Sequence, residues 1–256
     1  MAFTELVRIL DADPDLGAGL ERREHELARR HLVGEVVTLG RKRDVSAILE
    51  ELCAADLFGL LILDGLVVRR LEMVGERSVE LLAGGDVIRP CQADGDLASL
   101  PATATWVTYE RTRVAILDRD MHAVLSRFPT VLSELIGRLV QRANTLAVNL
   151  VIAQLPRLEE RLLALLWHLG DRFGHVEPGG VIVPLPLSHG TLAELVHARR
   201  PSVTTALSRL AERGLIVRHN DGRIRLLGDP RSVIEAERSD GPRLVLQTAG
   251  VPVTGE

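Results

Sequence analysis

The feature that most constrains the fold is the order of capping and turn residues in residues 188–227 of this 256-residue chain. Ser188 can cap a first helix, and after a short turn Pro201 can begin a second helix that ends at Gly214. The sequence His-Asn-Asp-Gly at 219–222 then predicts a β-hairpin. Any helical hairpin with a β-turn behind it is the alternative, but this full order of signals is less common. The segment predicts two closely joined helices followed by a hairpin wing.

The second predicted helix has one apolar side and one side rich in hydroxyl groups and arginine. Hydroxyl groups and a helix N-terminus can bind DNA phosphates, and arginine can form paired hydrogen bonds with guanine. This chemistry predicts a helix that reads the major groove of DNA. The candidate DNA-contacting residues are His189, Arg199, Arg200, Ser202, Thr205, Arg209 and Arg218.

Charge is distributed unevenly along the chain, whose net charge is −4. Residues 1–118 carry 14 basic and 21 acidic side chains, a net charge of −7, whereas residues 187–231 carry 8 arginines and 4 acids, a net charge of +4. A basic segment in an acidic protein is expected of a DNA-binding module. A solvated charged surface is the alternative, and charge alone does not decide between them.

Several short apolar runs separated by turn residues precede this segment, after a predicted helix at residues 21–32. Asp64-Gly65 between two such runs predicts a hairpin, and Gly84-Gly85 separates a second predicted strand pair. Closely spaced strands of this kind are typical of a small antiparallel sandwich or barrel. The predicted strands are residues 57–63, 66–71, 78–82, 86–88, 103–109 and 114–117.

A long apolar stripe follows these strands. Pro129 can begin a helix in which apolar residues recur at spacings of three and four for about three heptads. The stripe is covered either by this chain's own core or by a second copy, and we favour a dimer because two DNA-reading helices would then be paired. Pro156 ends the helix, residues 158–173 predict another, and residues 181–187 are at best a short edge strand because they contain prolines. The predicted dimer residues are Leu132, Leu135, Leu139, Ala143, Leu146 and Leu150.

The segment LSHGTLAELVHARRPSVTTALSRLAERGLIVRHNDGRIRLL resembles the winged helix-turn-helix of the Crp/Fnr family of bacterial transcription regulators. Upstream, GLLILDGLVVRRL and SVELLAGGDVI resemble that family's cyclic-nucleotide-binding-type β-roll, and the long stripe is similar to its dimerisation helix. The similarity covers most of residues 56–228 and is most specific in the last third, whereas residues 1–55 match poorly. It implies a homodimer that presents two recognition helices to a pseudo-palindromic DNA site.

The resemblance also implies roles for single positions. Arg200 occupies the position of a base-reading arginine, and Ser202 that of a phosphate-contacting hydroxyl. Thr205 occupies a base-contact position that some members fill with arginine, and Pro201 another that some fill with glutamate. Because of these two departures, the family's usual half-site sequence is not carried over.

The phosphate-binding residues of the family's cyclic-nucleotide binders are not matched. Those members place Gly-Glu shortly after a Gly-Asp turn and Arg-Ser or Arg-Thr further on. Here Gly85-Asp86 keeps the turn, but Arg89-Pro90-Cys91 follows it, and Ala102-Thr103 stands at the second position. A buried phosphate without a guanidinium partner is costly, so we do not expect ordinary cyclic AMP binding. Arg89 is the candidate effector contact, although a surface arginine is the preferred interpretation.

No cofactor, metal site or catalytic motif is evident. Cys53 and Cys91 lack metal-binding spacing and cannot supply the four thiolates of an iron-sulfur cluster, and His25, His31 and His122 form no motif. Phosphate-binding loops and nucleophile elbows are missing, so we do not expect an enzyme. The sequence has neither a signal-peptide pattern nor a membrane-length apolar run, which predicts a cytoplasmic protein that does not enter the membrane.

The expected architecture is α+β, with an N-terminal antiparallel, jelly-roll-like β-roll, a long dimerisation helix and a C-terminal winged helix-turn-helix. The predicted divisions are a sensor domain at 1–118, the dimerisation helix at 119–155, the DNA-binding domain at 156–231 and a tail at 232–256. Expected partners are double-stranded DNA, a second copy of the chain and RNA polymerase. The alternative is a ligand-sensing or partner-docking module whose winged helix binds protein. The effector, the target genes, the sign of regulation and the role of the cysteines stay open.

Overall fold

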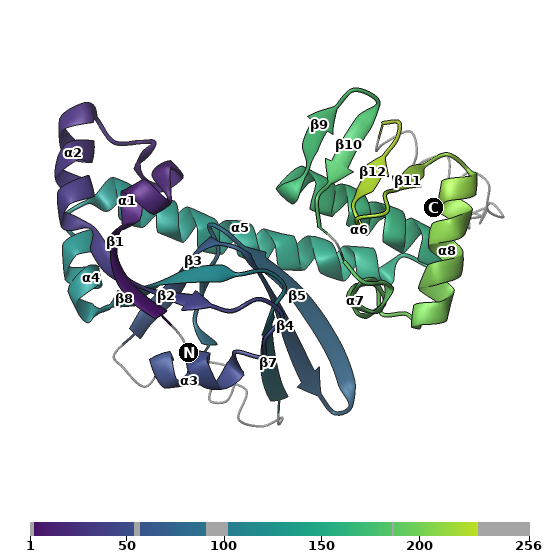
Figure 1. The fold of residues 1–256 in the computed structure, drawn as a ribbon, viewed down its shortest axis with the longest axis horizontal. Helices are drawn as coiled ribbons and strands as arrows, with labels where there is room; N and C mark the ends of the chain where they lie inside the picture. Colours follow the sequence, from purple (N-terminus) through teal and green to yellow (C-terminus); the bar gives the residue numbers. More distant parts are fainter. Residues whose placement is uncertain (1–2, 54–56, 91–101, 186, 230–256) are drawn as a thin grey trace, which may run out of the picture. The chain divides into compact units, whose positions relative to one another are not determined.

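The computed structural model describes residues 3–53, 57–90, 102–185 and 187–229, so Cys91 and the predicted tail at 232–256 lie outside the described residues. The chain forms two compact units, Met1–Val151 and Ile152–Glu256, and the division falls within the predicted dimerisation helix. The mixed α+β architecture predicted from the sequence is confirmed (Figure 1). None of the described helices is long and apolar enough to cross a membrane.

The N-terminal unit contains two antiparallel sheets, which together form the predicted β-roll (Figure 1). One sheet has the strand order β1-β2-β8-β3-β6, and the other has the order β5-β4-β7. The strands are β1 (Phe3–Arg8), β2 (Val33–Leu39), β3 (Leu57–Asp64), β4 (Leu66–Met73), β5 (Glu76–Ala83), β6 (Val87–Ile88), β7 (Ala102–Thr108) and β8 (Thr112–Asp118). The helices are α1 (Ile9–Ala12), the 3-10 turn η1 (Pro14–Gly17), α2 (Arg22–His31), α3 (Ser46–Cys53), α4 (Arg119–Leu125) and α5 (Pro129–Gln154).

Strand β3 is buried on both of its faces. Leu60 and Ile62 belong to a core cluster that includes residues of β4, β5 and β7 from the other sheet. Leu61 and Leu63 belong to a second cluster with residues of α1, α2, α4 and the start of α5. A strand covered on both sides has no polar face, which explains why residues 57–63 are apolar without alternation.

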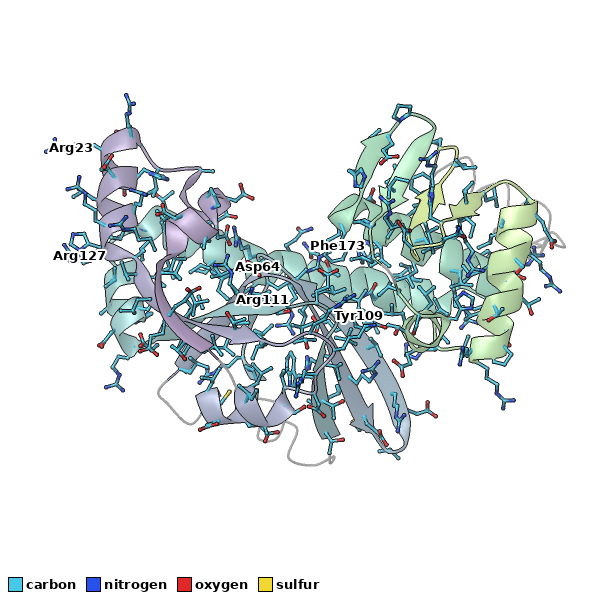
Figure 2. All side chains as sticks on the ribbon, in the orientation of Figure 1. Arg23, Asp64, Tyr109, Arg111, Arg127 and Phe173 are labelled. Atoms are coloured by element: carbon cyan, nitrogen blue, oxygen red, sulfur yellow. The ribbon has the colours of Figure 1, made fainter. Side chains whose placement is uncertain are left out.

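The predicted hairpin at Asp64-Gly65 is wrong. Strand β3 pairs with β8 and β6, while β4 pairs with β5 and β7, so the chain passes from one sheet to the other at this point. Gly65 has φ of 95°, and a Cβ there would lie 2.6 Å from the carbonyl oxygen of Arg111. A glycine is therefore needed at position 65, where the chain crosses closely from one sheet to the other. Asp64 lines a hollow of about 290 Å³ with Glu5, Arg111 and Arg113. Asp64 and Arg111 are labelled in Figure 2.

The second predicted strand pair is also wrong, because β5 and β6 lie in different sheets. The hairpin in this region joins β4 to β5, with register from Leu66 opposite Ala83 to Met73 opposite Glu76. Its turn is Val74-Gly75, with φ of 53° and 81°. A two-residue turn with both φ values positive suits the twist of a hairpin, but valine seldom adopts it, so the sequence gives no clear signal.

The C-terminal unit packs three helices with a four-stranded sheet of order β11-β12-β10-β9. Its elements are α6 (Leu158–Phe173), β9 (His175–Glu177), β10 (Gly180–Val183), α7 (His189–Leu195), α8 (Arg200–Glu212), β11 (Ile216–Arg218) and β12 (Ile224–Leu226). The predicted helices and wing hairpin are confirmed. The predicted edge strand at 181–187 is not: β10 lies between β12 and β9, and Pro184 follows its last residue, so no proline interrupts its pairing.

Candidate nucleic-acid interface

The turn between α7 and α8 is held by specific local contacts. Ser188 caps α7, since its hydroxyl oxygen accepts a hydrogen bond from the Thr191 amide at 3.1 Å. His197 adopts φ of 50°, and the amide of Ala198 donates to the carbonyl of Ala193 at 2.9 Å. These contacts reverse the chain directly after α7 and fix the start of α8.

The end of α8 is equally well defined. Gly214 has φ of 70°, and its amide donates to the carbonyl of Ala211 at 3.0 Å. The next amide, of Leu215, donates to the carbonyl of Leu210 at 3.0 Å. This pair of bonds is a Schellman motif, which confirms the predicted glycine stop. The buried side of α8 consists of Val203, Ala206, Leu207 and Leu210.

The exposed side of α8 carries Ser202, Thr204, Thr205 and Ser208. The hydroxyls of Thr204, Thr205 and Ser208 each donate to a carbonyl oxygen one turn earlier in the helix, at 3.1 to 3.2 Å. Within the described residues, the hydroxyl of Ser202 makes no such bond. Among the described hydroxyls on this face, that of Ser202 is therefore the one without a hydrogen bond to the helix backbone.

The four candidate arginines have different environments. Arg199 and Arg200 are exposed at the start of α8, and neither has an ion-pair partner within the described part of the chain. Arg209 is also exposed, but its guanidinium pairs with Glu159 at the start of α6, at 3.0 Å. Arg218, on β11, is bonded to His189. Within the described residues, Arg209 and Arg218 therefore already have side-chain partners, whereas Arg199 and Arg200 have no ion-pair partner.

His189 connects three elements of the winged helix. It is the first residue of α7, and its Nδ1 lies 2.9 Å from the hydroxyl of Thr204 on α8. Its Nε2 lies 2.8 Å from Nη2 of Arg218 on β11. Burial lowers the pKa of His189 below its usual range, and the charges of Arg218 and Arg200 lower it further. His189 was predicted to be an interface residue, whereas Thr204 was not, because its contact with His189 depends on the packing of α8 beside α7.

The wing is a regular hairpin between β11 and β12. Its turn is closed by the amide of His219, which donates to the carbonyl of Arg223 at 2.9 Å. Asp221 accepts from both the amide and the side chain of Arg223, and these bonds hold the pKa of the carboxyl below its usual range. The guanidinium of Arg223 is thus held at the turn by its own loop.

Helix α5 carries an exposed apolar stripe that coincides only in part with the stripe predicted from the sequence. Leu135 is only 2% exposed and belongs to the core of the N-terminal unit, so in this structure it contributes no surface for a partner. Leu139, Ala143, Leu146 and Leu150 are exposed, and Leu132 is half-buried. Five further exposed apolar residues of this helix were not predicted as dimer residues: Ile136, Val140, Ala147, Val148 and Val151.

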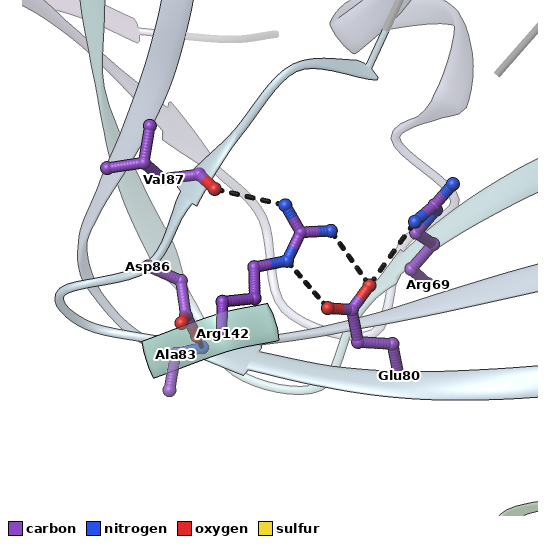
Figure 3. Close-up of polar contacts among 6 residues, drawn as sticks. All are labelled: Arg69, Glu80, Ala83, Asp86, Val87 and Arg142. Carbon is purple, nitrogen blue, oxygen red and sulfur yellow. Dashed lines mark hydrogen bonds and ion pairs between the residues drawn. The ribbon is translucent and has the colours of Figure 1, made fainter. Parts of the chain in front are cut away.

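The proposed effector contact, Arg89, is exposed, as expected of a surface arginine. The charged cluster in the N-terminal unit is built instead around Arg142 of α5 (Figure 3). Its guanidinium donates to both carboxylate oxygens of Glu80, at 2.6 and 2.9 Å, and to the carbonyl of Val87 at 3.1 Å. Arg69 donates to the same carboxylate at 3.3 Å. Sequence reasoning did not find this cluster.

A second arginine of α5 repeats the arrangement one turn earlier. Arg138 donates to both oxygens of the buried Asp13, at 2.5 and 3.0 Å. Its guanidinium also lies beside the turn at Gly85. Two arginines at i and i+4 thus fix α5 to the β-roll through buried carboxylates. Among the described residues, no group of three or more His, Cys, Asp and Glu side chains could hold a metal ion.

Comparison with known proteins agrees with this geometry. Residues 160–230, which span α6 to the wing, match the family model described as "Crp-like helix-turn-helix domain". This segment is therefore similar to Crp-like helix-turn-helix domains. A curated relative, the CRP-like cAMP-activated global transcriptional regulator of Mycobacterium tuberculosis, is 29% identical over 138 residues, which are 51% of this chain and 60% of the relative. The match with the Crp-like relative thus spans less than two thirds of the relative's length.

Two solved structures share the fold. A mutant of CooA from Carboxydothermus hydrogenoformans is 18% identical, with a TM-score of 0.58 over 78% of this chain and 86% of that one. FixK2 from Bradyrhizobium japonicum is 15% identical, with a TM-score of 0.57 over 80% of this chain and 97% of that one. The family-model match over residues 160–230 confirms the resemblance to the Crp/Fnr family that was drawn from the sequence, and the two solved structures confirm the fold.

Proposed function

We propose that this protein is a sequence-specific, DNA-binding transcription regulator that acts as a homodimer. The observation that carries the proposal is the start of α8, where Arg199, Arg200 and the unbonded hydroxyl of Ser202 are exposed together. Two guanidinium groups and a hydroxyl at a rigid helix start suit phosphate and guanine contacts. Large apolar anchors, which are typical of protein-docking surfaces, are missing from the described exposed side of α8.

The dimer is supported by the exposed stripe on α5. Ile136, Val140, Ala143, Ala147 and Leu150 follow one another at spacings of four and three, the spacing of a coiled-coil seam. Leu150 is 66% exposed, and so large an apolar side chain is costly to leave in water. A second copy that covers this stripe would place two α8 helices on two DNA half-sites one helical turn apart.

The regulator is proposed to work without cyclic AMP. Arg89 is exposed, and Arg142, the guanidinium that lies beside Val87, is already bonded to Glu80. A nucleotide phosphate that bound Arg142 would therefore have to displace the buried carboxylate of Glu80.

The proposal also includes a cytoplasmic location, action through RNA polymerase and a regulatory rather than an enzymatic role, as the resemblance implies.

DNA binding is tested by selection from random-sequence duplexes with the purified full chain, at two salt concentrations and without added ligand. We expect enrichment of an inverted repeat with half-sites about 10 bp apart, and weaker binding at the higher salt concentration. Arg200→Ala should abolish the enrichment, whereas Arg77→Ala, which removes an arginine paired with Glu72 on the β-roll, should not. Enrichment that survives Arg200→Ala would refute the assigned recognition helix. Added cyclic AMP should leave the enriched sequence and the affinity unchanged.

The dimer is tested by light scattering after gel filtration. Leu150→Glu should convert a dimer into a monomer, because it places charge in the seam. Leu27→Glu is the matched control, since Leu27 is also an exposed leucine on a helix, α2. A wild-type monomer, or equal effects of the two substitutions, would contradict the proposed seam.

A further inference from the structure

The hydrogen bonds of His189 define its protonation state in the free protein. A guanidinium group has donors and no acceptor, so Nε2 of His189 must accept the bond from Arg218 through its lone pair. The ring is then neutral and carries its proton on Nδ1, which donates to the hydroxyl of Thr204. That hydroxyl in turn donates to the carbonyl of Arg200 at 3.1 Å. The chain of donors runs in one direction, and a second proton on the ring would break its first bond.

The charges around the ring favour the same neutral state. Among the described residues, the charged groups that act on His189 are Arg218 on β11 and Arg200 on α8, and both are cations. The ring is also half-buried. The described part of the chain supplies no anion to this site, and a DNA phosphate is an anion that Arg200 and Arg218 could bind.

We propose that DNA binding is coupled to the uptake of one proton by His189, an inference that rests on the DNA-binding function proposed above. A phosphate that accepts a hydrogen bond from Arg218 draws this guanidinium away from Nε2. The exposed Nε2 lone pair then takes a proton from solvent or buffer acid, and the new N–H donates to the phosphate. One N–H bond forms, one Arg218–His189 hydrogen bond is lost, and the ring gains one positive charge beside the DNA.

The coupling predicts how DNA affinity changes with pH. By linkage, a group that is protonated only in the complex makes binding tighter as pH falls, by at most about tenfold per pH unit for one proton. His189 should therefore tighten binding between neutral pH and about pH 6, near the ordinary range of a histidine. A histidine that stayed neutral in the complex would add nothing to this slope.

The test uses the full chain and the inverted-repeat duplex enriched in the selection above. Fluorescence anisotropy gives the Kd from pH 8 to pH 6 at constant ionic strength for the wild type, His189→Gln and His197→Gln. Glutamine can accept from Arg218 but cannot be charged, and His197 is an exposed histidine in the adjoining turn that serves as the matched control. We expect the wild type and His197→Gln to bind roughly three- to tenfold more tightly at pH 6 than at pH 7.5, and His189→Gln to bind with little dependence on pH.

Calorimetry measures the proton uptake of the wild type directly. Titration of the same duplex into wild-type protein, in two buffers with different ionisation enthalpies, measures the number of protons taken up. Uptake approaching one proton near pH 6.5 is expected, and its loss in His189→Gln assigns it. Zero uptake by the wild type, or an equal pH slope in the wild type and His189→Gln, would overturn the inference while leaving DNA binding established. Failure to bind DNA at any pH would instead refute the proposed function.

Discussion

Replacing Arg142 with methionine is expected to destabilise the N-terminal unit strongly. The side chains of Glu80 and Arg142 are only 8% and 17% exposed, and the substitution removes both bonds to the carboxylate and the bond to the Val87 carbonyl. Breaking a buried ion pair by removing one partner costs about 3–5 kcal/mol, because the other charge is left without compensation. Arg69 still reaches Glu80 at 3.3 Å, so the lower end, about 3 kcal/mol, is expected.

The double variant Glu80→Leu with Arg142→Met distinguishes two effects, the loss of the ion pair and the cost of leaving the Glu80 charge buried without that partner. Two apolar side chains of similar volume restore packing without burying a charge, so the double variant should be clearly more stable than Arg142→Met alone. Arg77→Met is the matched control, because Arg77 pairs with Glu72 at 2.8 Å on an exposed surface, and it should cost less than about 1 kcal/mol.

The free energy of unfolding is measured in urea by tryptophan fluorescence. Trp106 lies in the N-terminal unit and Trp167 in the C-terminal unit, so a Trp167→Phe background limits the signal to the β-roll. A loss below about 1 kcal/mol for Arg142→Met would contradict the reasoning. So would a double variant whose loss equals the sum of the two single losses, because the two side chains would then act independently.

Three further predictions follow from the described contacts. Burial raises the pKa of Glu80, but hydrogen bonds and charges from Arg142 and Arg69 outweigh this effect and hold the pKa below its usual range. The Glu80 carboxylate therefore stabilises the fold at neutral pH, and this contribution is lost as pH falls below about 4.5. Acid titration followed by Trp106 fluorescence should show the loss in the wild type and not in Glu80→Gln. Gly65→Ala should lower the free energy of unfolding in urea by at least about 2 kcal/mol, because φ is 95° and the new Cβ would meet backbone atoms. Gly75→Ala, with φ of 81° and open space around the Cβ, should lower it by about 1 kcal/mol. Equal losses for the two variants would refute the close crossing between the sheets at Gly65. Glu159→Gln should release Arg209 and steepen the salt dependence of DNA affinity by about one counterion, and an unchanged slope would mean that Arg209 stays away from phosphate.

The helix-turn-helix was predictable because its determinants are local. The cap at Ser188, the proline in the first turn of α8 and the glycine stop at Gly214 each act within a few residues. The contacts of His189 were not predictable, since they join positions 15 and 29 residues apart and depend on how α7, α8 and β11 pack.

The β-roll was predictable as a set of strands but not as a set of pairs. The apolar runs predicted β3 and β4, but these two strands, which are consecutive in sequence, lie in different sheets and pair with different strands. A turn signal such as Asp64-Gly65 reports that the backbone needs positive φ, and a crossing between sheets needs this as much as a hairpin does. Pairing depends on which faces are buried, and β3 is buried on both.

The rotation of α5 about its axis explains why the predicted seam was partly wrong. Apolar spacing indicated a stripe, but it could not show which side of the helix faces the β-roll. The buried ion pairs of Arg138 and Arg142 decide this, because Leu135, Arg138 and Arg142 follow one another at spacings of three and four and so share the side that faces the roll. The side that begins at Ile136, about 100° further round the helix, is then left exposed. The charges that fix α5 to its own β-roll therefore also determine which apolar residues are available to a second copy.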